Sequence, residues 1–109
     1  MGQYHKLYNL DKREYVHPHR LDNGLKLLEQ VGHEKSTASA LFLLVANSNG
    51  RGGGDAEDHH MIGRWAGDRV LVQGDYAEPT DAAFLSEEDM APFVDISADV
   101  SAMLDVVFS

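Results

Sequence analysis

The chain has 109 residues, of which 43% are hydrophobic and 25% are charged, a composition typical of one globular domain spanning residues 1–109. It contains no cysteine, so disulfides, thiolate metal sites and cysteine nucleophiles are excluded. The net charge of −9 repels phosphate backbones, and we therefore expect no direct binding of nucleic acid.

A β-hairpin is the first element that the sequence predicts. Residues 3–9 alternate loosely and are rich in aromatic side chains, as is typical of a strand. The polar run 9–13 has the composition of a turn, and residues 14–17 return as a second strand that ends at Pro18. No apolar stretch follows the N-terminus, so we expect no signal peptide.

A short helix is predicted next. Leu25, Leu28 and Val31 follow helical spacing, and either Asp22 or Asn23 is suited to cap the first turn. A glycine follows at the point where this helix is expected to end.

The following helix is expected to form the centre of the core. Ser36 or Thr37 caps it, and its residues Ala38 and 40–46 are apolar on every face, which indicates burial on all sides. A buried strand is the alternative, because periodicity alone does not settle the structure of a short apolar run. The run is far shorter than the roughly 20 residues of a membrane span, so we expect a soluble, cytoplasmic protein.

A second hairpin is predicted around the single tryptophan. Residues 61–66 and 69–74 are two runs with strand composition, and the Gly-Asp pair between them is typical of a tight turn. In the second run, Val70 and Val72 are expected on the same face of the strand. Trp65 is more typical of a core residue than of a ligand platform, and we assign it to the core.

Two helices are predicted near the C-terminus. Residues 85–90 form one or two turns capped by Ser86, and Ser97 caps a longer helix over residues 98–108. The longer helix carries an apolar stripe at i, i+3, i+4 and i+7 spacing, formed by Val100, Met103, Leu104 and Val107. Two hairpins and about three helices, without strand–helix–strand alternation, predict the α+β class: a small antiparallel sheet with helices packed on one face.

The glycine-rich stretch 47–55 is the most conspicuous motif. A phosphate-binding P-loop places Lys and then Ser or Thr after its last glycine, whereas Gly54 is followed by Asp55. The dinucleotide pattern Gly-x-Gly-x-x-Gly also fails, because Asp55 occupies the position of the last glycine. Carboxylates at this place repel phosphate, so we interpret residues 50–55 as a connector and predict no cofactor.

Histidines and acidic residues define an alternative interpretation. His17 and His19 would point to the same side of an extended segment, and residues 55–60 combine Asp, Glu and His. None of these groups has the spacing of an established zinc motif, and no nucleophile elbow is present. We predict no metal site and no catalytic residue. The alternative is a small metal- or nucleotide-binding enzyme centred on residues 50–55 with their Asp and His neighbours.

The C-terminal part of the chain carries the strongest charge signal. Residues 36–109 contain three basic and thirteen acidic side chains, and neither Lys nor Arg follows Arg69. Such a surface either keeps the protein soluble or meets a basic partner, because carboxylates on a rigid scaffold can replace phosphates in a basic groove. We predict a partner-binding surface that contains Asp75, Glu78, Asp81, Glu87, Glu88 and Asp89.

Several motifs occur in an order that resembles a known family. The chain opens with MGQYHKLYNLDKREYVHPH and continues with GLKLLE, NGRGGGD, WAGDR and GDY, over about the first 76 residues. In this order the motifs resemble a family of small uncharacterised proteins from phages, prophages and their bacterial hosts. The resemblance implies a mobile-element setting, in which small acidic proteins bind and block host machinery, including CRISPR effectors. It assigns no catalytic or binding residue.

The predicted function is that of a small, acidic, non-enzymatic protein-binding module. Its expected partner is a basic host protein or nucleoprotein complex, and its expected effect is inhibition by occupancy, as in an anti-CRISPR protein. The sequence predicts neither the oligomeric state nor the identity of that partner.

Overall fold

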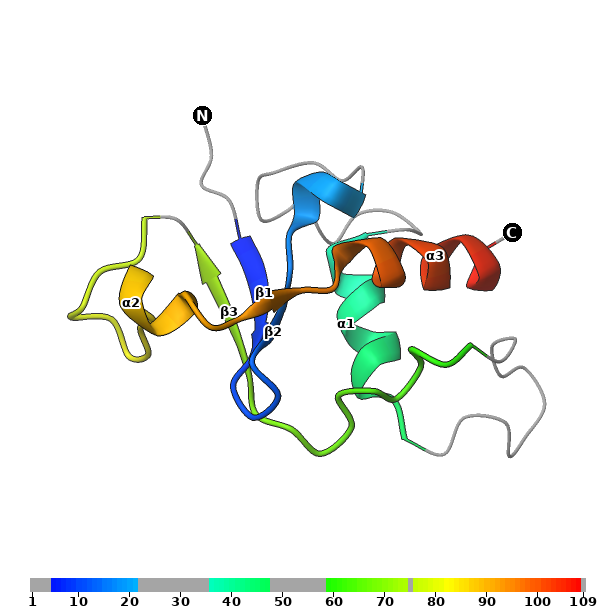
Figure 1. The fold of residues 1–109 in the computed structure, drawn as a ribbon, viewed down its shortest axis with the longest axis horizontal. Coiled ribbons are helices and arrows are strands. Elements are labelled where there is room, and N and C mark those ends of the chain that lie inside the picture. Colours follow the sequence, from blue (N-terminus) through cyan, green and yellow to red (C-terminus); the bar gives the residue numbers. More distant parts are fainter. Residues whose placement is uncertain (1–4, 22–35, 48–58, 75, 109) are drawn as a thin grey trace.

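The computed structural model describes residues 5–21, 36–47, 59–74 and 76–108, and Figure 1 shows their arrangement. The elements follow in the order β1 (His5–Asn9), β2 (Glu14–Val16), the 3-10 helix η1 (Pro18–Leu21), α1 (Thr37–Val45), β3 (Val70–Gly74), α2 (Glu87–Met90), β4 (Val94–Asp95) and α3 (Ser97–Val107). The helix expected over residues 25–31 and the stretch 50–55 lie outside the described residues. No helix within the described ranges is long and apolar enough to cross a membrane.

A four-stranded sheet with the strand order β3-β1-β2-β4 organises the fold. β1 and β2 form the predicted antiparallel hairpin, in which Leu7 lies opposite Val16 and Asn9 lies opposite Glu14. β3 pairs antiparallel with the other side of β1, whereas β4 joins β2 in parallel. The predicted α+β class is therefore confirmed, but the sheet is mixed rather than built from two antiparallel hairpins.

The predicted second hairpin is wrong in its first arm. Residues 60–67 form a succession of turns, and β3 pairs with β1 instead. These turns run past the C-terminal end of α1, where the Gly63 N–H donates to the Leu43 carbonyl at 2.9 Å. The Trp65 N–H donates to the Leu44 carbonyl at 2.8 Å. The last carbonyls of a helix have no partner within the helix, so the turns satisfy acceptors that a hairpin strand would leave unpaired.

Helix α1 begins as predicted, with the Ser36 hydroxyl accepting a hydrogen bond from the Ser39 N–H at 3.1 Å. Its expected burial on all sides is wrong, because Phe42 is 75% exposed. Ala40 and Leu44 are fully buried in the core and Leu41 and Leu43 pack partly against it, so one side of the helix makes the packing contact. An all-apolar sequence does not reveal this side, because single apolar side chains are common on protein surfaces.

The predicted apolar stripe of α3 lies in the core, where the most buried members are Val100, Met103 and Leu104. Ser97, however, does not cap this helix as predicted. Its buried hydroxyl accepts a hydrogen bond from the His17 N–H at 2.8 Å, and its own N–H donates to Asp95 Oδ1 at 2.8 Å. Ser97 therefore joins the end of the first hairpin to α3.

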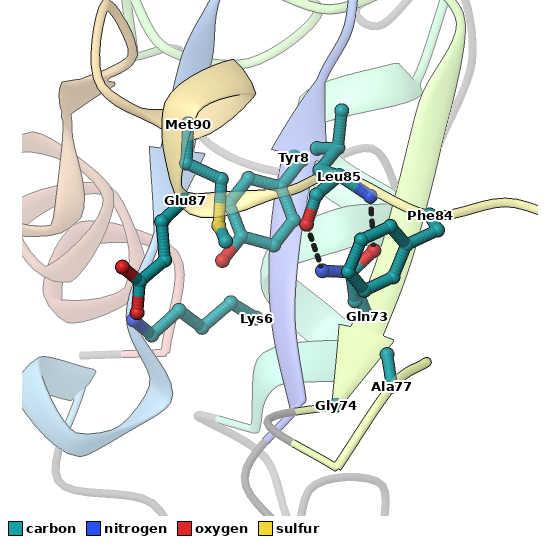
Figure 2. A pocket seen from close by; sticks show the side chains of 9 residues that line it. All are labelled: Lys6, Tyr8, Gln73, Gly74, Ala77, Phe84, Leu85, Glu87 and Met90. Atoms are coloured by element: carbon teal, nitrogen blue, oxygen red, sulfur yellow. Dashed lines mark hydrogen bonds between the residues drawn. The ribbon is translucent and has the colours of Figure 1, made fainter. Parts of the chain in front are cut away.

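The sheet is covered on both faces, which corrects the expectation of helices on one face only. Successive residues of a strand point to opposite faces. Leu7 and Val16 belong to the hydrophobic cluster that α1 and α3 complete. Tyr8 points to the other face, where its ring meets the ring of Phe93 edge-on with centroids 5.8 Å apart. In Figure 2, α2 lies on this second face, in front of the sheet.

Candidate functional site

The predicted acidic surface lies on the segment that connects β3 to β4. Gln73, in β3, holds this segment on the sheet through a pair of hydrogen bonds. Its Nε2 donates to the Leu85 carbonyl at 2.9 Å, and its Oε1 accepts from the Leu85 N–H at 2.8 Å. Gln73 is only 8% exposed, so water competes little for these bonds. The pair fixes the chain just before α2 begins (Figure 2).

A capping box fixes α2 itself. The Ser86 hydroxyl accepts from the Asp89 N–H at 3.1 Å, and the Asp89 carboxylate accepts from the Ser86 N–H at 3.0 Å. The hydrogen bonds from the backbone and the side chain of Ser86 lower the pKa of Asp89 below its ordinary value of 3.8. Asp89 therefore stays ionised near neutral pH while one of its oxygens is engaged in the helix terminus.

The structure divides the predicted acidic residues into two groups. The first turn of α2 and the preceding loop carry the exposed members Glu87, Glu88, Asp89, Glu78 and Asp81. In the loop, the Asp81 carboxylate accepts from the Glu78 N–H at 2.8 Å, so it also braces the local turn. Asp75 lies outside the described residues.

Basic side chains of the first hairpin border the α2 group. Lys6 lines a hollow together with Glu87, and Arg13 lines another together with Glu88. Asp81 lines a third hollow, to which the described chain contributes neither Lys nor Arg. The carboxylates of α2 are therefore partly compensated by charges of the protein itself, and the loop group is less so.

A cavity of about 320 Å³ lies between the sheet and α2 (Figure 2). Phe84 and Met90 supply apolar walls, and Tyr8 and Lys6 supply polar groups. Burial, with a contribution from the neighbouring Tyr15, raises the pKa of Tyr8, so its hydroxyl stays protonated at neutral pH. The charged side chains that line this cavity are those of Lys6 and Glu87.

Glu14 is the one buried carboxylate of the described chain, and the sequence did not single it out. It is 7% exposed and accepts hydrogen bonds from Arg64 Nε at 3.0 Å and from Trp65 Nε1 at 2.8 Å. Burial raises the pKa of this carboxyl, but the hydrogen bonds from Arg64 and Trp65 outweigh that effect and hold the pKa below its ordinary value. Both oxygens are engaged, so Glu14 ties the Trp65 turns to the hairpin and is not available as a catalytic group.

Two further carboxylates tie the same turns to the first hairpin. Asp11 accepts from the Arg69 N–H at 2.7 Å and from its guanidinium at 2.8 Å. Asp68 accepts from Asn9 Nδ2 at 2.9 Å and pairs with Lys12. The hydrogen bonds from Arg69 lower the pKa of Asp11 below its ordinary value of 3.8. The hydrogen bonds from Lys12, and then from Asn9, lower the pKa of Asp68 in the same way. Asp11 and Lys12 of the first hairpin thus pair with Arg69 and Asp68 of the WAGDR motif.

The proposed alternative site has few described residues. No group of three or more His, Cys, Asp or Glu side chains within the described ranges is placed to hold a metal ion. His59 and His60 stack with ring centroids 4.4 Å apart, and His59 Nδ1 accepts from the Met61 N–H at 3.2 Å. The stretch 50–55, around which the alternative enzyme was centred, lies outside the described residues.

Comparison of the chain with models of protein families, with curated proteins and with solved structures gave no match. The features that sequence reasoning missed here are Glu14 and Gln73, whose partners are distant along the chain. Their only visible signal was a polar residue inside a strand pattern.

Proposed function

We propose that this protein is a small, acidic, non-enzymatic binding module of a mobile genetic element. It inhibits a basic host protein, such as a CRISPR effector, by occupying the groove that holds nucleic acid. The observation that supports this proposal most directly is the attachment of the acidic segment. Gln73 fixes Leu85 on the sheet, and Ser86 and Asp89 fix the first turn of α2. Carboxylates held in place bind a groove at a smaller cost in conformational entropy than carboxylates on a flexible tail.

The distribution of charge supports the same function. After Arg69 the chain contains neither Lys nor Arg, so the charged side chains of the segment that carries α2 are all acidic, with Lys6 and Arg13 of the first hairpin at its border. A basic groove attracts carboxylates and phosphates by the same long-range field, which accelerates association and is screened by salt. The module therefore competes with nucleic acid for the groove without performing chemistry of its own.

Exposed apolar side chains flank the acidic segment and provide a second kind of contact. Tyr76 and Val94 are each 60% exposed, before and after α2 in the chain. Protein interfaces commonly combine apolar or aromatic anchors with a charged rim. In the proposed interface, Tyr76 and Val94 supply the apolar contacts beside the carboxylates.

The test compares carboxylates at two places in the fold. The variant E87Q/E88Q removes two charges from α2, and the matched variant D99N/D105N removes two charges from α3, which lies toward the other end of the molecule (Figure 1). DNA cleavage by a panel of CRISPR effectors is measured with each protein across a salt series. We expect wild type and D99N/D105N to inhibit one effector at low salt, and E87Q/E88Q to inhibit it less. Equal inhibition by the two variants, or the lack of any inhibition across the panel, contradicts the proposal.

A further inference from the structure

The outer edge of β3 presents backbone groups that no described residue binds. β3 lies at the end of the strand order and pairs with β1 alone. The Leu10 N–H donates to the Arg69 carbonyl at 2.9 Å, one step beyond the ladder in the same register. Opposite residues in an antiparallel ladder alternate between hydrogen-bonded and non-hydrogen-bonded pairs. Because Leu10 and Arg69 form a hydrogen-bonded pair, the Asn9–Val70 and Leu7–Val72 pairs are non-hydrogen-bonded. The N–H and C=O groups of Val70 and Val72 therefore point away from β1, toward the open edge.

The composition of β3 leaves this edge open to pairing. Natural sheets protect their edges with Lys, Pro, bulges or very short strands. β3 has five residues, Val-Leu-Val-Gln-Gly, without charge or proline, whereas the opposite edge strand β4 has only two residues. Val72 is 45% exposed, so an apolar side chain lies beside the unpaired groups. The two edges of the sheet thus differ, and only β3 is long enough to template a new strand.

A hollow of about 510 Å³ beside the end of β3 gives room for an added chain. Val72 and Gly74 line it on the strand side, and Tyr76 and Asp81 line it on the loop side. The Gly74 carbonyl accepts from the Ala77 N–H at 3.1 Å, and Ala77 also lines the hollow. An extended segment in this hollow would meet backbone, aromatic and carboxylate groups together.

We propose that an extended segment of the basic partner, containing Lys or Arg, pairs with β3 and adds a strand to the sheet. This inference rests on the proposed function and specifies the form in which the partner is bound. The free groups of Val70 and Val72 supply the backbone hydrogen bonds, and Asp81 attracts a basic side chain. A second copy of this chain is a poor occupant, because pairing of two β3 edges would bring together two acidic loops of chains that each carry a net charge of −9.

The experiment uses a short alternating Lys-Val peptide as the probe and backbone amide exchange, measured by NMR, as the readout. One control peptide has the same sequence with every backbone amide N-methylated, which keeps the charge and removes the donors. The other control replaces Lys with Glu. We expect the Lys-Val peptide to slow exchange at Val70 and Val72 by about tenfold or more, as protection by new hydrogen bonds requires, with Leu71 and Gln73 changed little. Neither control peptide should have this effect.

The contrary outcomes separate this inference from the proposed function. Equal binding of the N-methylated peptide, without protection of Val70 and Val72, overturns strand pairing and leaves the acidic-surface proposal standing. The absence of binding by the Lys-Val peptide, or protection that rises with protein concentration alone, also overturns it. Strand pairing with the peptide but no inhibition of any effector supports the open edge and refutes the proposed function.

Discussion

Replacing Glu14 with Gln tests the buried network that holds the Trp65 turns on the first hairpin. The substitution removes the charge that Arg64 neutralises, while the amide oxygen can still accept from Trp65 Nε1. Breaking a buried ion pair by removing one partner costs about 3–5 kcal/mol. The side chain of Arg64 is 41% exposed and can be hydrated after the change, so we expect a loss of about 3 kcal/mol, the lower end of that range.

Urea unfolding followed by the fluorescence of Trp65, the single tryptophan, measures this loss in the free energy of unfolding. The variant E88Q is the matched control, because it makes the same chemical change at an exposed position of α2. We expect E88Q to leave the urea midpoint close to that of wild type. An E14Q midpoint equal to that of wild type at neutral pH would refute the reasoning.

The pH dependence of E14Q provides a second readout. In the folded protein the pKa of Glu14 lies below its ordinary value of 4.5. The unfolded chain therefore binds the proton more readily, and the stability contributed by the carboxylate is full above pH 4.5 and is lost as the pH falls through the folded-state pKa. The stability difference between wild type and E14Q should be constant near neutral pH and should shrink below pH 4.5. A difference that grows on acidification contradicts this assignment.

Three further substitutions test the packing around the turns and helices. Gly63→Ala places a Cβ 2.9 Å from the Ala46 carbonyl at a φ of +80°, whereas Gly67→Ala has a φ of +82° but its added Cβ meets nothing within 4 Å. We therefore expect Gly63→Ala to lower the urea midpoint more than Gly67→Ala. Equal losses would contradict the steric argument. Leu44→Ala removes a fully buried side chain and should cost about 2–5 kcal/mol in thermal unfolding, and a smaller loss would show that the core collapses around it. Ser97→Ala removes the hydroxyl that accepts from the His17 N–H and should cost about 1–3 kcal/mol. The His17 amide should then exchange faster, and unchanged exchange would count against this bond.

Sequence signals predicted the elements that depend on near neighbours. The hairpin of β1 and β2, a cap on α1 at Ser36 or Thr37 and the capping of α2 by Ser86 each follow from residues a few positions apart. The buried stripe of α3 follows from helical spacing in the same way. Each of these predictions was confirmed because the chemistry that decides it is local.

The predictions that failed depend on partners far along the chain. Residues 61–66 have the composition of a strand, but their backbone donors are needed at the end of α1. Ser97 has the chemistry of a cap, but its hydroxyl is taken by the backbone of His17. β4 is too short for its sequence to indicate a strand and exists because β2 offers it an edge. A single sequence contains no direct record of such pairings.

The candidate site also combines features that the sequence predicted with features that depend on distant partners. Charge counting located the exposed carboxylates of α2 and of the preceding loop. It did not predict that Gln73 fixes the segment on the sheet, nor that Asp89 and Asp81 also brace their own turns. It also missed the basic side chains of Lys6 and Arg13 beside α2, because these come from the other end of the chain.

Displacement of nucleic acid from a basic effector tests the central proposal most directly. Labelled DNA is bound to a CRISPR effector, the protein is added, and fluorescence anisotropy reports the DNA that remains bound. We predict displacement by wild type and by D99N/D105N, weaker displacement by E87Q/E88Q, and a decline for all three as salt is raised. Displacement that is the same for both variants, or binding to the effector that leaves the DNA in place, would contradict inhibition by occupancy of the nucleic-acid groove.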